Sequence, residues 1–270
     1  MKATVLVDNI AGGDLSGEWG LSIYIENQGK KILLDTGASG LFLKNAEALG
    51  LSIRAVDAGV LSHAHYDHAD GMADFFKEND QASFYLREGA GENCYEKKGA
   101  EYQYIGLPRH ILSDYKERIV FVSGDYTLFP GVYLIPHKTP GLSEMGKKNN
   151  MVVYGDKGWQ PDDFSHEQSL VIQTGQGLVI FNSCSHGGAD TIIREVKATF
   201  PDQKINALIG GFHLYARSGE EVRDLAWRIR ETGIQTVITG HCTGDKGYKI
   251  LREELGDRVT QMQVGRVMAF

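Results

Sequence analysis

The segment LSHAHYDHADGM, at positions 61–72, constrains the fold of this chain more than any other stretch of its sequence. It follows an apolar run that predicts a strand, and it gathers four potential metal ligands: His63, His65, Asp67 and His68. On extended backbone, side chains two residues apart point the same way, so His63 and His65 can present both imidazoles to one point. The turn that follows lets Asp67 and His68 face a second point close by. Imidazole and carboxylate groups bind zinc, iron or manganese, so the segment predicts a metal site at the end of a buried strand.

The composition of the 270-residue chain limits what kind of protein surrounds this site. Hydrophobic residues make up 42% and charged residues 23%, which indicates a folded globular protein rather than a disordered or fibrous one. A net charge of -7 argues against nucleic acid as a partner, and no apolar run approaches the ~20 residues that span a bilayer. The opening MKATVLVDNI lacks signal-peptide features, and the odd number of cysteines (Cys94, Cys184, Cys242) favours a reducing compartment. We therefore expect a cytoplasmic protein without a membrane partner.

The hydrophobic pattern predicts an α/β chain with a single domain over residues 1–270. Strands are expected in the first 35 residues, at FPGVYLIP, INALIGG and IQTVITG, and in a hairpin around residues 174–177. Helices are expected at LFLKNAEALG, GMADFFKEN, ADTIIREVKATF, EEVRDLAWRIRETG and YKILREELG. This arrangement favours two sheets packed between helical layers. Residues 85–118, polar and rich in tyrosine, predict a lid or pocket excursion, and residues 137–166 predict a long connection.

The pattern His-x-His-x-Asp-His after a buried strand resembles the signature of the metallo-β-lactamase superfamily. Further similarity lies in KKILLDTG, which contains Asp35, and in the runs HEQSLVIQTGQGLVIFNSCSH, LIGGFHL and ITGHCTG. These runs are similar to a subgroup named 7,8-dihydropterin-6-yl-methyl-4-(β-D-ribofuranosyl)aminobenzene 5′-phosphate synthase-like. The resemblance implies an αββα four-layer sandwich that holds two divalent transition-metal ions, with zinc expected first and iron or manganese as alternatives. It also implies that Asp35 supports the metal-binding histidines from behind.

The resemblance also indicates the ligands of the second metal. His241, at the end of the strand IQTVITG, matches the last histidine of the superfamily pattern and would complete this site with Asp67 and His68. Superfamily members commonly have a bridging aspartate at the end of the strand GLVIFNSCS, where this chain has Cys184. Cys184 either bridges the metals as a thiolate or is a small buried residue, in which case water alone bridges them.

The first metal needs a third imidazole beside those of His63 and His65, and two residues can supply it. His186 follows a buried strand in NSCSH and matches the subgroup pattern. His166 lies where many superfamily members place this ligand, but it falls in the polar stretch PDDFSHEQ, which suits a surface loop. We favour His186. His213, just past the apolar strand INALIGG, is then left over as a hydrogen-bond donor or proton donor in catalysis.

The expected activity is hydrolysis by a metal-activated hydroxide, with His213 and the metal ligand Asp67 as the catalytic residues. The expected substrate is a small, anionic ester, lactone or phosphoester, with a pterin- or nucleotide-like ring as one candidate. Four side chains in the polar excursion either contact this substrate or simply pack beneath a loop. They are Tyr95, Tyr102, Tyr104 and Arg109. Alternatives are a transferase or synthase of the dihydropterin type and a non-catalytic metal-dependent binding module, and a homodimer is permitted.

Two other active sites are weaker interpretations of the same sequence. LLDTGAS is similar to an aspartic-protease motif, but such a protease needs two carboxylates, and no second Asp-Thr-Gly exists to pair with Asp35. A cysteine nucleophile would pair Cys184 with His186, or Cys242 with His241. Neighbouring Cys and His residues at strand ends occur often by chance, so the metal site remains the favoured interpretation.

Overall fold

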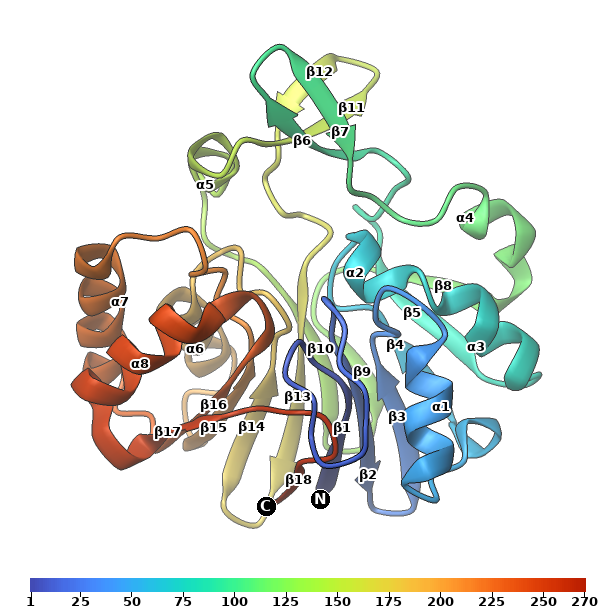
Figure 1. Ribbon diagram of the computed structural model, residues 1–270, viewed down its shortest axis with the longest axis horizontal. Coiled ribbons are helices and arrows are strands. Elements are labelled where there is room, and N and C mark those ends of the chain that lie inside the picture. Colours follow the sequence, from blue (N-terminus) through green and yellow to red (C-terminus); the bar gives the residue numbers. More distant parts are fainter.

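The computed structural model describes residues 1–270, and two seven-stranded sheets form its centre (Figure 1). Strand order is β18-β1-β2-β3-β4-β5-β8 in the first sheet and β17-β16-β15-β14-β13-β10-β9 in the second. The first sheet consists of β1 (Lys2–Val7), β2 (Ser22–Asn27), β3 (Lys30–Leu34), β4 (Ala58–Val60), β5 (Ser83–Arg87), β8 (Ile119–Val122) and β18 (Val267–Ala269). The second consists of β9 (Tyr126–Phe129), β10 (Val132–Pro136), β13 (Gln168–Thr174), β14 (Gly177–Phe181), β15 (Ile205–Gly210), β16 (Thr236–Thr239) and β17 (Val259–Gln261).

Helices cover the outer face of each sheet, on opposite sides of Figure 1. Beside the first sheet lie α1 (Leu41–Ala48), α2 (Tyr66–Ala69), α3 (Met72–Glu78) and α4 (Ile111–Asp114). Beside the second lie α6 (Ala189–Thr199), α7 (Gly219–Glu231) and α8 (Gly244–Leu255). The αββα four-layer sandwich expected from the sequence is therefore confirmed. None of these helices combines the length and apolar character needed to cross a membrane.

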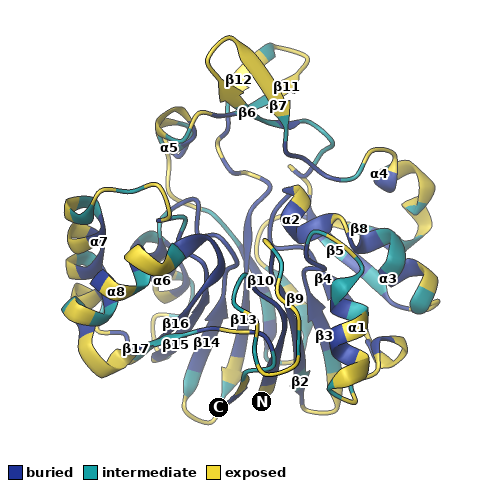
Figure 2. Ribbon diagram, in the orientation of Figure 1, coloured by how far each residue is buried: buried dark blue, intermediate teal, exposed yellow.

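Apolar side chains fill the three interfaces between the layers. One buried cluster, which includes Ile23 and Phe181, lies between the two sheets. A second cluster brings Phe42 of α1 and Phe75 of α3 onto the first sheet, and a third brings Ile192 of α6 onto the second. Central strands are apolar on both faces because each sheet is covered on both sides. Figure 2 shows the consequence, with buried strands inside and exposed residues along the outer sides of the helices.

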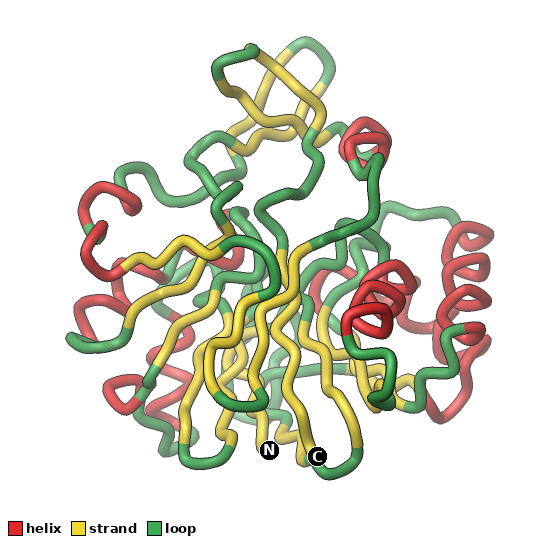
Figure 3. Tube along the Cα trace, turned by 180° about the vertical axis from the view of Figure 1, so that it is seen from behind, coloured by secondary structure: helices red, strands yellow, loops and turns green.

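A third, four-stranded sheet stands above the sandwich, and we call it the upper sheet (Figures 1 and 3). Its strand order is β12-β11-β6-β7. The strands are β6 (Cys94–Lys98), β7 (Glu101–Tyr104), β11 (Met151–Gly155) and β12 (Gly158–Pro161), with the short helix α5 (Ser143–Lys148) preceding β11. The hairpin β6–β7 and the hairpin β11–β12, far apart in the sequence, therefore form one sheet.

The upper sheet differs from what the sequence predicted for residues 85–118 and 137–166. Residues 85–87 belong to β5, and α4 also lies within the first segment beside the sandwich, so only the middle of residues 85–118 leaves the core. The second segment is not a plain connection, since it contains α5, β11 and β12. Those strands are short, largely exposed and pair with a remote hairpin, so they carry no strong local hydrophobic pattern.

Candidate metal centre

The predicted ligands converge at one edge of the sandwich, beneath the upper sheet. They follow the carboxyl ends of β4 in the first sheet and of β14 and β16 in the second. The carboxyl ends of β14 and β16 lie at one edge because β14, β15 and β16 are parallel neighbours. β4 ends at Val60, and the amide of His65 then donates to the carbonyl of His63 at 3.0 Å. A tight turn, rather than a continued strand, therefore brings these two imidazoles together.

The first group of side chains consists of His63, His65 and His186, whose potential ligand atoms lie within 4.8 Å of one another. All three are buried. Burial lowers the pKa of His65 to about 3 and lowers those of His63 and His186 well below the usual value, so the rings are neutral. Nε2 of His63, Nε2 of His65 and both ring nitrogens of His186 have no hydrogen-bond partner in the protein. Neutral, unpartnered imidazoles that face one another form a suitable cradle for a cation.

The second group consists of Asp67, His68 and His241, also within 4.8 Å. Oδ2 of Asp67 lies 3.3 Å from Nε2 of His241 and 3.7 Å from Nε2 of His68. Burial raises the pKa of Asp67, but the neighbouring His68 and His241 outweigh that effect and hold it well below its usual range. The short helix α2 supplies Asp67 and His68, and the 3-10 turn His241–Thr243 supplies the third member.

Hydrogen bonds behind the rings fix which nitrogen faces the centre. Nδ1 of His68 donates to Oδ2 of Asp35 at 2.8 Å, and Nδ1 of His241 donates to Oδ1 of Asn9 at 3.0 Å. Ser62 Oγ gives its proton to Asp35 and therefore accepts from Nδ1 of His63 at 2.8 Å. In each ring the Nε2 lone pair then points inward, as metal ligation requires.

Asp35 lies directly behind the histidines, as the sequence predicted for it. Its carboxylate is fully buried and accepts bonds from the amide and hydroxyl of Ser62, from the hydroxyl of Ser183 and from His68. Its backbone is held at φ 59, which is uncommon for a non-glycine residue. A carboxylate this enclosed has no second aspartate with which to share a proton, and the aspartic-protease interpretation is wrong.

Two supporting residues, Asp8 and Asn9, were missed in the sequence. Oδ2 of Asp8 accepts a hydrogen bond from the backbone amide of His241 at 2.9 Å. The side-chain amide of Asn9 donates to the backbone carbonyl of His241 at 3.3 Å. The available signal was the polar pair that ends the apolar run ATVLV, at the same edge of the sheet. It has no special spacing, so the sequence alone could not connect it to His241.

Cys184 lies between the two groups. Its Sγ belongs to one cluster with His63 and His68 and to another with His241 and Cys242. It is 3.3 Å from Nε2 of His68 and 3.3 Å from Sγ of Cys242. The position expected for a bridging ligand is therefore occupied by this thiol.

His166 differs from the sequence expectation in its surroundings. The stretch 161–168 is not a surface loop, since Asp162, Phe164 and His166 are all buried. The amide of Ala64 donates to Nδ1 of His166 at 3.1 Å, so Nε2 carries the proton and donates to Oδ2 of Asp162 at 3.0 Å. Both ring nitrogens are thus engaged, which leaves His186 as the third imidazole of the first group.

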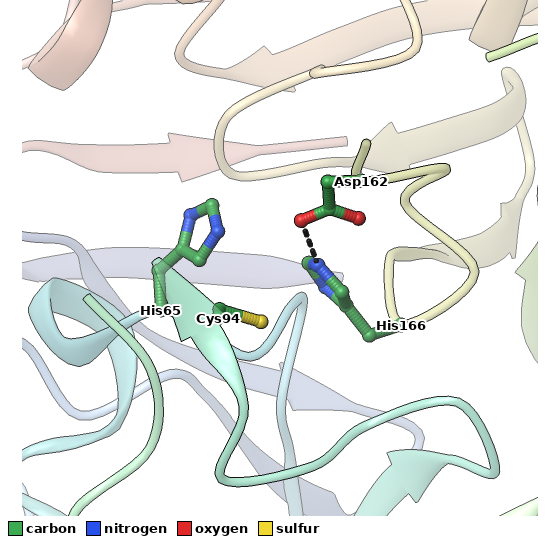
Figure 4. Close-up of side chains that lie close together, drawn as sticks. All are labelled: His65, Cys94, Asp162 and His166. Atoms are coloured by element: carbon green, nitrogen blue, oxygen red, sulfur yellow. Dashed lines mark hydrogen bonds and ion pairs between the residues drawn. The ribbon is translucent and has the colours of Figure 1, made fainter. Parts of the chain in front are cut away.

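Figure 4 shows His166 in a second cluster, with His65, Cys94 and Asp162. Metal binding through Nε2 of His166 would leave that ring without any proton, because Nδ1 already accepts the amide of Ala64. Both ring nitrogens of His166 are already paired within the protein, so this cluster suits a cation less well than the two groups described above. Cys94 is the first residue of β6 and Asp162 follows the last residue of β12. The chain therefore enters and leaves the upper sheet close to His65.

His213 lies beside the first group without joining it. Its ring centre is 4.7 Å from that of His186, and its buried Nδ1 has no partner in the protein. The amide of His213 donates to Sγ of Cys242 at 3.1 Å, and its backbone has φ 48. The preceding Gly210 is required there, since a Cβ atom would lie 1.9 Å from the carbonyl oxygen of Asn182.

A cleft opens between these residues and the upper sheet. Side chains of the upper sheet that line it include Glu96, Lys98 and Gln103. The tyrosines that the sequence offered as substrate contacts lie on the alternate positions of the same strands, so they face the other side. There Tyr102 stacks on Trp159 with ring centres 3.7 Å apart, and Arg109 lies 3.6 Å from the centre of Tyr104. None of these residues lines the cleft, and in the structure they pack against one another and against Trp159.

Comparisons with known proteins agree with this geometry. A family model described as the metallo-beta-lactamase superfamily matches residues 20–154. The chain is 26% identical, over 100% of its length and 97% of the relative, to a Methanocaldococcus jannaschii protein named 7,8-dihydropterin-6-methyl-4-(beta-D-ribofuranosyl)-aminobenzene-5'-phosphate synthase. It matches the crystal structure of Tm1679, a metal-dependent hydrolase of the beta-lactamase superfamily, with TM-score 0.85 and 27% identity over 100% of this chain and 99% of that one. Zn(2+)-bound PqqB from Methylobacterium extorquens shares the fold, with TM-score 0.59 and 13% identity over 100% of both chains.

Proposed function

The chain belongs to the metallo-beta-lactamase superfamily, and on that premise we propose that it is a binuclear metal-dependent hydrolase of a small, anionic ester, lactone or phosphoester. One observation carries the proposal. Nε2 of His68 and Nε2 of His241 lie 3.2 Å apart, and both rings have their protons on Nδ1. Two facing lone pairs repel each other unless a cation or proton lies between them. The pair, together with Asp67, therefore fits a cation, and the unpartnered nitrogens of the first group fit another.

We propose zinc for both positions. The donors are imidazoles, one carboxylate and the thiol of Cys184, and a soft sulfur donor favours zinc over manganese or magnesium. Cys184 spans both groups and is therefore proposed as the bridging ligand. The three cysteines are free, which supports our proposal that the protein works in a reducing cytoplasm.

Bound divalent ions lower the pKa of a coordinated water and stabilise negative charge on the attacked group. The chain then has three tasks. Asp35, Asn9 and Ser62 keep the ligand rings in the correct tautomer. Asp67, held ionised and buried, can orient a water for attack. His213 lies at the rim of the same cleft, where a ring N–H can donate to an oxyanion or a leaving group.

The walls of the cleft support a ring-bearing, anionic substrate. Trp19, Tyr66 and Tyr215 line the cleft and remain partly exposed, so a flat ring has aromatic faces to contact. Lys98 of the upper sheet also lines the cleft, where its ammonium is paired with the carboxylate of Glu96 at 3.2 Å. A second recess, which also contains His186 and His213, adds three basic side chains partly compensated by Glu221 and Asp224. They are Lys148, Arg217 and Arg228.

A second candidate activity follows from the full-length similarity to the M. jannaschii protein. The chain would then be a transferase or synthase that forms a compound of the dihydropterin–ribofuranosylaminobenzene phosphate type. The same histidines, Asp67 and Cys184 would hold the divalent ions that either reaction requires. The cleft geometry alone does not favour this candidate over hydrolysis.

The experiment is a substrate panel with zinc-loaded and chelator-treated protein. We expect zinc-dependent release of product from at least one ester, lactone or phosphoester, and loss of that release after chelation. A parallel incubation tests the synthase: it combines ribofuranosylaminobenzene phosphate with a dihydropterin that carries a leaving group on its 6-methyl carbon, which the new bond displaces. Condensation without any hydrolysis would replace our proposal by the second candidate. Zinc-dependent binding of panel members with neither reaction would indicate a non-catalytic module.

A further inference from the structure

Three buried side chains outside the metal ligands form a continuous chain, which we call the buried clamp: Glu167, His137 and Glu195. Nε2 of His137 contacts Oε2 of Glu167, and Nδ1 lies 2.9 Å from Oε2 of Glu195. Ionised carboxylates only accept hydrogen bonds, so both ring nitrogens donate and the ring is an imidazolium. Burial alone would lower the pKa of His137, but the two carboxylates raise it to about 10. His137 therefore stays positively charged at neutral pH.

Glu167 extends from the clamp to the loop that carries His186. Its Oε1 accepts the backbone amide of His186 at 3.0 Å, and its Oε2 accepts the amide of Gly187 at 3.2 Å. One carboxylate thus holds two consecutive amides of the ligand loop. Glu167 directly precedes β13, and His186 follows β14. The contact therefore joins the start of β13 to the loop after its antiparallel neighbour β14.

The loop depends on this contact because the ring of His186 has few other anchors. Neither ring nitrogen of His186 has a hydrogen-bond partner in the protein. The ring stacks on Phe164, with centres 4.8 Å apart, which restrains its plane but not its position along that plane. Gly187 lies directly on the clamp, since a Cβ atom there would be 2.4 Å from Cε1 of His137.

The far end of the clamp is fixed to α6. Oε1 of Glu195 accepts the amides of Lys138 and Thr139, each at 2.8 Å. The segment that follows β10 is therefore attached to a long helix, and His137 is held from both sides. Without the positive charge of His137, Glu167 and Glu195 would be two buried carboxylates near each other, an arrangement that is unfavourable unless one becomes protonated or moves.

We propose that His137 is a positioning residue for the first metal: its imidazolium fixes the Glu167 carboxylate, which fixes the backbone of His186. The inference rests on the proposed function in one respect, namely that His186 is a metal ligand. A plain alternative is that the clamp only stabilises the fold. The two differ in what they affect, because a merely structural clamp would change stability without favouring one metal group over the other.

The test is a zinc titration of metal-free protein whose histidine rings carry nitrogen-15, followed by NMR. The resonances of His63, His65 and His186 report the first group, and those of His68 and His241 report the second. In His137→Gln we expect zinc affinity at the first group to fall about tenfold to a hundredfold, with the second group unchanged. Glu195→Gln, a milder change, should give a smaller fall at the same group and serves if His137→Gln does not fold.

Two reference variants complete the experiment. His186→Ala removes the ligand itself and sets the largest loss expected at the first group. Val196→Ala, a buried truncation on the same helix as Glu195, should lower the unfolding temperature while leaving both zinc affinities intact. Equal affinities in His137→Gln and wild type, or equal falls at both groups, would overturn the inference. A wild-type protein that binds no zinc at any histidine would instead contradict the proposed function, and the inference with it.

Discussion

The double substitution of His63 and His65 by alanine is expected to abolish metal binding at the first group and to reduce hydrolysis to background. Only His186 would remain there as an unshared protein ligand, and fewer than three protein ligands rarely hold a catalytic cation. Both rings are buried, and Nε2 of each has no hydrogen-bond partner in the protein. The substitution therefore removes potential metal ligands, and the only side-chain hydrogen bond it breaks is the one between His63 and Ser62. Elemental analysis of the purified variant, beside circular dichroism to confirm folding, measures the effect.

The matched control is His110→Asn. His110 is exposed and lies outside every ligand cluster, and its backbone has φ 69, a conformation that asparagine tolerates better than alanine. This variant should keep its full metal content and activity. Full metal content in the folded double variant would show that the first site has been placed wrongly.

His213→Ala is expected to retain its metal and to lose on the order of a hundredfold or more in turnover, the usual scale for a positioned donor. The ring of His213 lies against that of His186, and its Nδ1 has no partner in the protein, so it is free to bond a reacting group. Steady-state kinetics and metal analysis on the same preparation separate the two effects. The assay uses whichever ester, lactone or phosphoester the panel identifies.

Backbone strain is the main confounding effect at this position. Because His213 has φ 48, alanine there costs some stability, whereas asparagine adopts this conformation more readily. His213→Asn should therefore show the same loss of turnover with less loss of stability. If either variant loses a metal equivalent, His213 is a ligand; if turnover and metal are both unchanged, its role is structural. Both results contradict the catalytic assignment.

The sequence predicted the sandwich and most members of the two ligand groups because both depend on short-range patterns. Apolar runs defined the central strands, and the close spacing of His63, His65, Asp67 and His68 marked the site. Resemblance to the superfamily then supplied His241 at the end of β16. The structure brings all of these side chains to one edge, with His186 among them.

What the sequence could not provide are contacts between buried polar groups far apart in the chain. Glu167 and Glu195 meet at His137 across 30 and 58 positions, respectively, and no periodicity connects them. The same limitation explains the misjudged stretch around His166. Polar residues usually indicate a surface loop, but here Asp162 and His166 satisfy each other in the interior. The upper sheet was missed for a related reason. It forms by pairing of two hairpins that are far apart in the sequence, and no local pattern indicates that pairing.

Cys184, which we propose as the bridging ligand, is the main departure from the common superfamily pattern. Cys184 contacts His68 and Cys242, and no carboxylate other than Asp67 belongs to the ligand clusters around it. A sulfur donor in this place raises the preference for zinc over harder cations. The account therefore places zinc first among the metals to be found in the protein.

The most direct test of the central claim is elemental analysis of wild-type protein purified without exposure to chelators. The two groups of imidazoles, with Asp67 and Cys184, predict about one to two equivalents of transition metal per chain, with zinc in excess over iron and manganese. One equivalent would mean that only one of the two groups holds its cation tightly. Protein that contains no transition metal, and takes up none from added zinc, would contradict the account.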